Sequence, residues 1–317
     1  MHKPVMLIQM MELLSVKKEG VYIDATVGSG GHAKALLERL GVDGRLLGID
    51  RDEDAIKRTE KRLLDREGQC QLLLGNFSDI KGLAQKARVK EVDGIVMDLG
   101  MSSEQIDQGD RGFSFMHEGL LDMRMDRTQA VTAEKIVNTY DRGEIADILW
   151  NFGEEKASSR VANRIVLARQ KGRIKTTKEL AQIVSDAKGG RRGRIHPATK
   201  TFQALRIAVN RELESLSKGL EEAVGLLREG GRLAVISYHS LEDRNVKQCF
   251  SQHVGRWESL NEGGSRWKGS MPVAQWITHT FVVPDQEEVQ QNPRARSSKL
   301  RVIERIKNAE EKKTKTK

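Results

Sequence analysis

The sequence predicts an α/β protein with a doubly wound, mostly parallel sheet and a helical inserted domain. Short apolar segments that end on polar residues alternate with helical stretches over the first hundred residues. A glycine-rich turn joins the first strand to its helix. The alternation stops after residue 100 and resumes near residue 232, so one nucleotide-binding domain is interrupted by an insertion.

The first βαβ unit covers residues 22–50 and contains Gly28, Gly30 and Gly31 between strand and helix. Glycine permits positive φ and lets a ligand lie against the main chain. Asp50 ends the second strand, where a carboxylate can accept hydrogen bonds from both hydroxyls of a ribose. We therefore expect an adenosine-type ligand; the alternative is a turn that only closes the βα connection.

Two ligands fit this turn. Gly28, Gly30 and Ala33 match the pattern G-x-G-x-x-[GA], which keeps a nicotinamide dinucleotide open. Asp24 lies four residues before Gly28, and its carboxylate would be poorly placed beside a pyrophosphate. The same carboxylate suits a ligand that carries an ammonium and a sulfonium, which favours S-adenosylmethionine.

Hydrophobic spacing predicts the other elements in order. A helix is expected within residues 1–18. Further strands are expected at 45–49, 71–77, 93–100 and 232–237, with helices at about 53–66 and 79–88, and an antiparallel edge pair at 279–283 and 299–306. Apolar residues at steps of four and three predict one long helix from Leu205 to Leu227, ended by Gly230 and Gly231.

These elements predict three regions. Residues 1–104 and 201–306 form the cofactor-binding domain, residues 105–200 form a helical insertion, and residues 307–317 form a basic tail. The insertion includes two helical segments with one apolar face each; one carries Ile145, Ile148, Leu149 and Phe152, and the other carries Val161, Ile165 and Ala168.

The net charge and the cysteine content indicate what kind of partner the protein binds and whether it holds a metal. The 317 residues carry a formal net charge of +9, which indicates a polyanionic partner. Residues 188–200 hold five basic residues and no acid, and nucleic-acid contact is expected at the glycine-interspersed stretch 188–194; for residues 307–317 a solvated tail is the favoured interpretation. Cys70 and Cys249 show no metal-ligand spacing and predict free thiols and no metal site.

No signal peptide or membrane-spanning run is evident, so a cytoplasmic protein without a membrane partner is expected. The sequence leaves the oligomeric state open, a homodimer included.

Candidate site residues follow the strands of the predicted sheet, because ligands of such sheets bind beyond the carboxyl ends. Asp98 follows an apolar run, where a cationic ligand would compensate its burial, with a turn-capping acid as the alternative. Phe77 could lie against an adenine or cap the core. His239 and Ser240 could hold the substrate, and a structural histidine is the alternative.

Eight sequence blocks resemble the RsmH (MraW) family. They read HKPVM (2–6), DATVGSGGH (24–32), DLGMSSEQID (98–107), RGFSF (111–115), LDMRMD (121–126), HPATKTFQALRIAVNREL (196–213), SYHSLEDR (237–244) and NPRARSSKLR (292–301). Family members commonly read SFHSLEDR and NPRSRSAKLR, so Tyr238, Ala295 and Ser298 are mild departures.

The resemblance implies a class I, Rossmann-like methyltransferase that uses S-adenosylmethionine to methylate N4 of a cytosine in the decoding centre (P-site region) of bacterial 16S ribosomal RNA, within the small ribosomal subunit. Carried over by motif, the implied cofactor-binding residues are Gly30, Gly31, His32, Asp50, Phe77, Asp98 and Gln105.

Methylation of a cytosine amine requires groups that accept its N–H hydrogen bonds, and Asp98 and His239 are the candidate catalytic residues. The flipped base could stack on Phe113 or Phe115, or these rings could close the insertion onto its core. The residues expected to contact phosphates are Arg111, Arg191, Arg192 and Arg194. A nicotinamide-dependent dehydrogenase and a non-catalytic RNA-binding ribosome-assembly protein are the alternative functions.

Overall fold

The computed structural model describes residues 4–66, 68–190, 196–259, 265–268 and 272–307. The chain divides into two compact units. The first combines Met1–Gly100 with Leu213–Lys317, and the second is Met101–Glu212. The second unit therefore extends beyond the predicted insertion of residues 105–200 at both ends.

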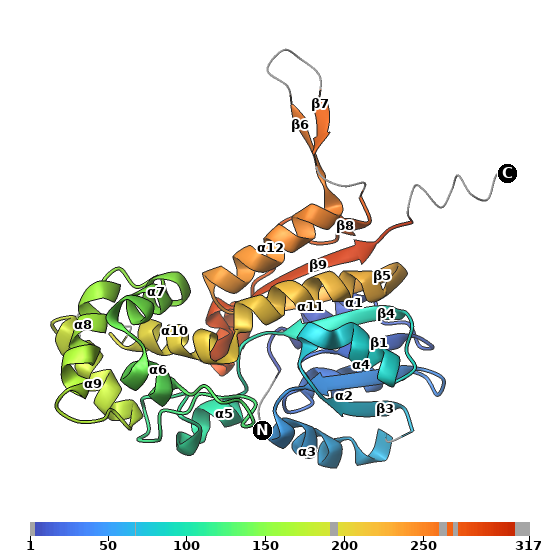
Figure 1. The fold of residues 1–317 in the computed structure, drawn as a ribbon. Helices are drawn as coiled ribbons and strands as arrows, with labels where there is room; N and C mark the ends of the chain where they lie inside the picture. The colour runs from blue at the N-terminus through green and yellow to red at the C-terminus, as the bar shows by residue number, and fades with distance from the viewer. Residues whose placement is uncertain (1–3, 67, 191–195, 260–264, 269–271, 308–317) are drawn as a thin grey trace. The chain divides into compact units, whose positions relative to one another are not determined.

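The first unit contains a seven-stranded sheet in the order β3-β2-β1-β4-β5-β9-β8 (Figure 1). The strands are β1 (Val21–Asp24), β2 (Arg45–Asp50), β3 (Cys70–Leu74), β4 (Val92–Asp98), β5 (Leu227–Ser237), β8 (Ala274–Trp276) and β9 (Lys299–Arg305). Strands β1 to β5 pair in parallel, and β9 is antiparallel to both of its neighbours. The predicted mostly parallel sheet is confirmed, and its strand order reverses between β1 and β4.

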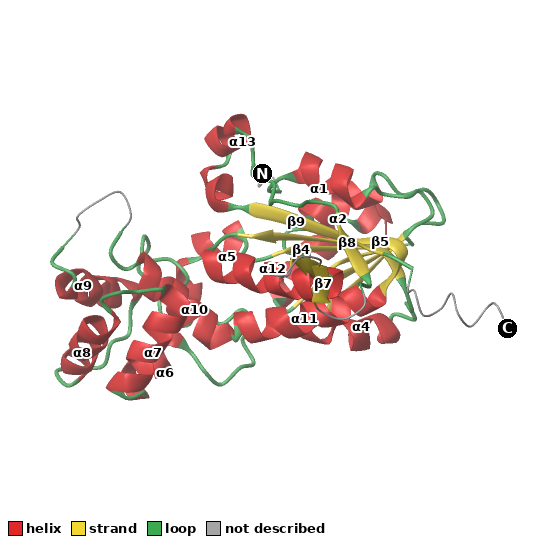
Figure 2. Cartoon of the chain, turned by 90° about the horizontal axis from the view of Figure 1, so that it is seen from above, coloured by secondary structure: helices red, strands yellow, loops and turns green. Residues whose placement is uncertain are grey.

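Helices cover both faces of this sheet (Figure 2). One face packs against α1 (Leu7–Leu14), α2 (Gly31–Leu37) and α3 (Glu53–Arg62), and the other against α4 (Ile80–Lys86), α11 (Glu212–Leu226) and α12 (Ser240–Val254). Successive strand residues point to opposite faces, so Tyr22 joins one core cluster and Ile23 the other. Burial on both sides explains why the strands read as continuous apolar runs.

Several predicted boundaries at the sheet's edges are wrong. Strand β3 ends at Leu74, because the side chain of Asn76 caps the 3₁₀ turn η2 (Phe77–Asp79) by accepting the Ser78 N–H. Residues 279–283 do not form the edge strand. Only Val282 makes an isolated bridge, to Leu300, and β8 takes the edge instead.

The antiparallel hairpin of β6 (Arg256–Ser259) and β7 (Ser265–Lys268) was not predicted. Short helical elements η1 (Leu64–Arg66), α13 (Gln286–Gln291) and η4 (Pro293–Ser297) complete the first unit.

The predicted long helix from Leu205 to Leu227 is two helices. Helix α10 (Thr199–Asn210) ends at Arg211, whose φ of 49° is left-handed, and α11 begins at Glu212. The Arg206 guanidinium binds the Glu212 carboxylate across this break through two hydrogen bonds, at 2.9 and 2.8 Å. The glycines do not end α11 either, since β5 starts at Leu227 and its register with β4 shifts before Arg232.

The second unit is helical in its regular structure. It contains α5 (Ser103–Asp107), η3 (Gly109–Arg111), α6 (Ala133–Thr139), α7 (Arg142–Gly153), α8 (Ser158–Arg169), α9 (Thr177–Ala187) and α10. Its core includes the predicted positions Ile145, Leu149, Val161 and Ile165. Over the described ranges, no helix has the length and apolarity needed to cross a membrane.

Candidate active site

The glycine turn lies between β1 and α2, beside the reversal of strand order. Gly28 and Gly30 have φ of 53° and 74°, in the left-handed region that favours glycine. A Cβ on Gly30 would lie 2.9 Å from the Thr59 side chain, and a Cβ on Gly31 would lie 2.7 Å from that of Pro4. Backbone conformation thus favours glycine at position 28, close packing favours it at position 31, and both favour it at position 30.

Asp50 holds this turn in place. Its Oδ2 accepts the Gly28 N–H at 2.8 Å, and its Oδ1 accepts the Asp52 N–H at 2.9 Å. Burial raises the pKa of Asp50, and these two backbone donors oppose the rise. Each carboxylate oxygen has a second lone pair, so the group can still accept the two hydroxyls of a ribose.

Asp24 is a fully buried carboxylate whose pKa is raised. It is only 1% exposed, and its Oδ1 accepts the Thr26 N–H at 3.2 Å. Within the described part of the chain, Oδ2 has no hydrogen-bond partner. Burial raises the pKa of Asp24 to about 6, the charge of His32 opposes this rise, and the charges of Asp98 and Asp50 add to it. A buried oxygen of this kind fits a cationic group of a ligand.

Asp98 ends β4 and is held from several sides. Its backbone N–H donates to Thr26 Oγ1 at 2.7 Å, and the Tyr238 hydroxyl donates to its Oδ1 at 2.7 Å. Burial raises the pKa of Tyr238 well above 10.0, so this hydroxyl keeps its proton. The result is a carboxylate with a fixed orientation at the carboxyl end of the sheet.

His32 lies on the other side of Asp98, with its Nδ1 3.7 Å from Asp98 Oδ2. Its Nε2 is 3.0 Å from the Val5 carbonyl oxygen, which can only accept, so Nε2 carries the proton. The sequence did not predict the roles of Tyr238 and Thr26 beside Asp98. The family pattern gave no signal for Tyr238, because a phenylalanine is common there.

His239 has a structural role. Its Nδ1 accepts the Glu242 N–H at 3.3 Å, and Glu242 in turn accepts the His239 N–H in a capping box at the start of α12. Its Nε2 lies 3.1 Å from Glu242 Oε1. Both ring nitrogens thus face Glu242, which favours the structural alternative for His239. Ser240 is the exposed first residue of α12.

Phe77 begins η2 and packs against α11. Its ring lies so close to Gly219 that a Cβ there would be 2.5 Å from ring atom Cδ2. One part of the ring therefore covers the core, as the structural alternative expected, and the side chain remains half-buried.

The other predicted residues belong to the second unit. Gln105 is 6% exposed, and its side-chain oxygen accepts the Ser102 N–H in the capping box of α5. Phe113 is buried in the unit's core. Phe115 stacks on His196 with ring centroids 4.5 Å apart. These contacts favour the interpretation in which Phe113 and Phe115 close the insertion onto its core.

Arg111 is not a phosphate contact in this structure. Its side chain is buried, and its guanidinium donates to the carbonyl oxygens of Arg124 and Met125, each at 3.1 Å. An arginine was expected on the surface here, but the loop folds over it and uses it to satisfy main-chain carbonyls. The predicted phosphate contacts Arg191, Arg192 and Arg194 lie outside the described residues.

The doubly wound sheet and the carboxylates beside its glycine turn define a nucleotide-cofactor enzyme with a Rossmann-like fold. Residues 1–306 match the model of the MraW methylase family, and the chain belongs to that family. The methyltransferase class that the eight sequence blocks implied is thus confirmed.

The chain is similar to two named relatives and to one solved structure. The chain is 46% identical over 309 residues to "Ribosomal RNA small subunit methyltransferase H" of Acetivibrio thermocellus, covering 96% of this chain and 99% of the relative. It is 44% identical to the protein of the same name from Symbiobacterium thermophilum, covering 98% of each. A solved rRNA methylase from Streptococcus thermophilus matches 97% of this chain and 99% of its own, at 12% identity and a TM-score of 0.43.

The MraW methylase family uses S-adenosylmethionine, so the predicted cofactor is confirmed and the nicotinamide alternative is wrong. The residues present fit this ligand. Asp24 offers a buried carboxylate oxygen with no hydrogen-bond partner among the residues that the structure describes, and Asp50 retains lone pairs beside the glycine turn.

Proposed function

We propose that this protein transfers a methyl group from S-adenosylmethionine to N4 of a cytosine in the decoding centre of 16S ribosomal RNA, within the small ribosomal subunit. The name shared by the relatives supports a small-subunit RNA substrate. The observation that carries the methyl-donor site is Asp24, which is buried with an unpartnered oxygen near two further carboxylates.

S-adenosylmethionine supplies an electrophilic methyl carbon on a sulfonium. Asp24 would accept a hydrogen bond from the ammonium group of the ligand, and Asp50 would accept hydrogen bonds from the ribose hydroxyls. Gly30, Gly31 and His32 would border the ligand at the turn, and the exposed part of Phe77 would contact the adenine. Gln105 is proposed as a cofactor contact on the family's pattern alone.

Asp98 is the group we assign to the cytosine amine. The amine is a poor nucleophile because its lone pair is delocalised into the ring, so catalysis depends on holding it in line and accepting its N–H hydrogen bonds. Asp98 has a carboxylate oriented by Tyr238. His239 is less suited, because its Nδ1 lone pair already accepts the Glu242 N–H; it positions the start of α12 beside the substrate.

RNA recognition is assigned to the second unit and to the basic stretch of residues 188–200. Arginine-rich, glycine-interspersed segments neutralise phosphates and bind RNA with strong salt dependence. Ser240, exposed at the start of α12, is a further substrate contact in this proposal.

The test is methyl transfer by the full-length protein. Labelled S-adenosylmethionine is incubated with 30S subunits, and separately with naked 16S RNA, from a strain that lacks this gene. We expect label on one of them, recovered after nuclease digestion as N4-methylcytidine. Asp98→Asn should lower the rate by about 100-fold or more, as expected when a positioned acceptor is lost.

Asp43→Asn is the matched control, because Asp43 is an exposed acid in the turn before β2. Its rate should equal that of the wild type. Absence of label on both substrates would favour the non-catalytic assembly protein, and label on another base or atom would overturn the N4 assignment.

A further inference from the structure

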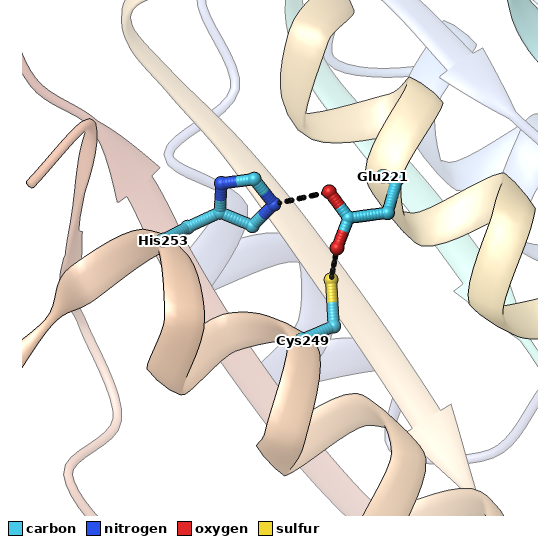
Figure 3. Close-up of side chains that lie close together, drawn as sticks. All are labelled: Glu221, Cys249 and His253. Carbon is cyan, nitrogen blue, oxygen red and sulfur yellow. Dashed lines mark hydrogen bonds and ion pairs between the residues drawn. The ribbon is translucent and has the colours of Figure 1, made fainter. Parts of the chain in front are cut away.

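Three side chains capable of binding a metal meet between α11 and α12, in the first unit (Figure 3). Glu221 comes from α11, and Cys249 and His253 come from α12. The Cys249 thiol donates to Glu221 Oε1 at 3.4 Å, and His253 Nε2 lies 2.8 Å from Glu221 Oε2. One carboxylate therefore stands between a thiol and an imidazole.

The spacing explains why sequence analysis missed this cluster. The two cysteines were compared with each other, whereas the relevant pair is Cys249 and His253, four residues apart on α12. Residues at this spacing lie on the same face of a helix, one turn apart. The third residue, Glu221, is 28 positions from Cys249 and comes from another helix, so only the fold brings it into place.

The geometry suits a tetrahedral ion. With bonds of about 2.3 Å to sulfur and about 2.0 Å to nitrogen and oxygen, Zn²⁺ separates its ligand atoms by about 3.3–3.5 Å. The ligand atoms here all lie within 4.8 Å of one another, and the thiol-to-carboxylate distance of 3.4 Å already matches. The distance of 2.8 Å between His253 Nε2 and Glu221 Oε2 is shorter than zinc requires, so these two side chains must separate slightly when an ion enters.

Two of the three side chains are partly exposed, and a cavity borders the cluster. Glu221 is 51% exposed and His253 is 21% exposed, which gives an ion a path from solvent. A cavity of about 350 Å³ borders Glu221 and Cys249, with Gln248 and Gln252 among its lining residues. Water in this cavity can supply the fourth ligand of a site with three protein ligands.

We propose that Glu221, Cys249 and His253 form a zinc-binding site that fastens α12 to α11. Thiolate and imidazole together select Zn²⁺ over the hard cations Mg²⁺ and Ca²⁺. On binding, the S–H bond of Cys249 breaks, its electron pair forms the sulfur–metal bond, and the proton leaves to solvent. The lone pair of His253 Nε2 and one carboxylate oxygen of Glu221 complete the protein ligands.

The protonated thiol is the resting form without metal. Burial raises the pKa of Cys249, and the charge of Glu221 and the hydrogen bond to it add to this rise. The site is structural, because Cys249 lies nine residues along α12 from Ser240, a rise of about 14 Å from the end of the sheet where Asp98 lies.

The experiment is Co²⁺ and Zn²⁺ titration of the untagged, full-length protein after chelator treatment. Co²⁺ should give a thiolate-to-metal charge-transfer band and tetrahedral d–d absorption, at one ion per chain, and Zn²⁺ should displace it. Cys249→Ser should abolish the charge-transfer band. His253→Ala and Glu221→Gln should weaken Co²⁺ binding by roughly 100-fold or more, since even outer contacts of a metal site cost 10–100-fold.

Cys70→Ser is the matched control, because Cys70 is the other free cysteine and lies on β3. It should keep the band and the stoichiometry. Circular dichroism of each variant separates loss of a ligand from loss of fold, and Glu221→Gln alters an exposed residue that folding should tolerate. Three results would each overturn the proposal. They are a missing charge-transfer band in the wild type, a band that persists in Cys249→Ser, and a Co²⁺ affinity of Glu221→Gln and His253→Ala equal to that of the wild type.

Discussion

The hydroxyl of Tyr238 makes a polar contact at the candidate active site that the phenylalanine common in the family pattern could not make. It donates to Asp98 Oδ1 at 2.7 Å and orients that carboxylate. Because a phenylalanine is common at this position, Tyr238→Phe should fold normally. A net hydrogen bond contributes about 1 kcal/mol, so kcat for methyl transfer should fall about fivefold.

Tyr140→Phe controls for the loss of a hydroxyl elsewhere, since Tyr140 caps the end of α6 in the second unit. It should leave kcat unchanged. Equal rates for wild type and Tyr238→Phe would show that Asp98 does not depend on this hydrogen bond.

Asp24 should make the free energy of unfolding fall as the pH rises, and should make the affinity for the cationic cofactor rise with pH. Its pKa rises from 3.8 to about 6 on folding, so the folded state binds the proton more tightly than the unfolded chain. The contribution of Asp24 to the free energy of unfolding is therefore fully present below pH 4 and is lost as the pH rises through 6. The shift in pKa from 3.8 to about 6 corresponds to on the order of 3 kcal/mol.

Asp24→Asn removes this dependence. Without ligand, the variant should gain stability relative to the wild type as the pH rises from 4 to 7, measured by urea unfolding at each pH. It should also bind S-adenosylmethionine more weakly, measured by calorimetry at pH 7.5. A variant that loses stability at pH 7, or that binds the cofactor normally, would contradict the role of Asp24.

At the scale of elements, hydrophobic spacing predicted the type of most segments and misplaced several ends. The apolar steps from Leu205 to Leu227 fit one helix, yet the chain breaks at Arg211. A periodic pattern is nearly the same for one helix as for two that share a core face. The break depends on the ion pair of Arg206 with Glu212 and on a left-handed residue, neither of which leaves a periodic signal.

The edge strand of the sheet was also misplaced by prediction from hydrophobic spacing. The apolar run at residues 279–283 has strong β-propensity, but the chain pairs β8 with β9 and leaves this run with one bridge at Val282. Propensity describes how a residue fits a half-buried surface, and the neighbouring strand decides which surface that is. Ala274, at the start of β8, is buried in the core although its propensity for strands is low.

For the whole molecule, we expect the net positive charge to affect RNA binding and to leave cofactor binding unchanged. Replacing Arg191, Arg192 and Arg194 by alanine should weaken binding to 16S RNA and reduce the slope of log K against log salt by about 2–3, because each phosphate contact contributes about 0.7–0.9. Calorimetry should give the wild-type affinity for S-adenosylmethionine.

A triple alanine variant of Lys312, Lys313 and Lys315 makes the same change in charge in the predicted solvated tail. This tail variant should change the slope of log K against log salt less than the arginine variant does. An unchanged slope in the arginine variant would remove the 188–200 stretch from the RNA-binding surface.

The amino-acid sequence alone was enough to predict the fold class, the glycine turn with Asp24 and Asp50, and the family. These are local or patterned properties, since buried parallel strands, tight turns and conserved-length motifs are written in consecutive residues. The three-dimensional fold was needed to show that Tyr238 fixes Asp98, that Arg111 is buried, and that Glu221 meets Cys249 and His253. Each depends on residues distant in the chain, whose contact is set by packing and leaves no periodic trace in the sequence.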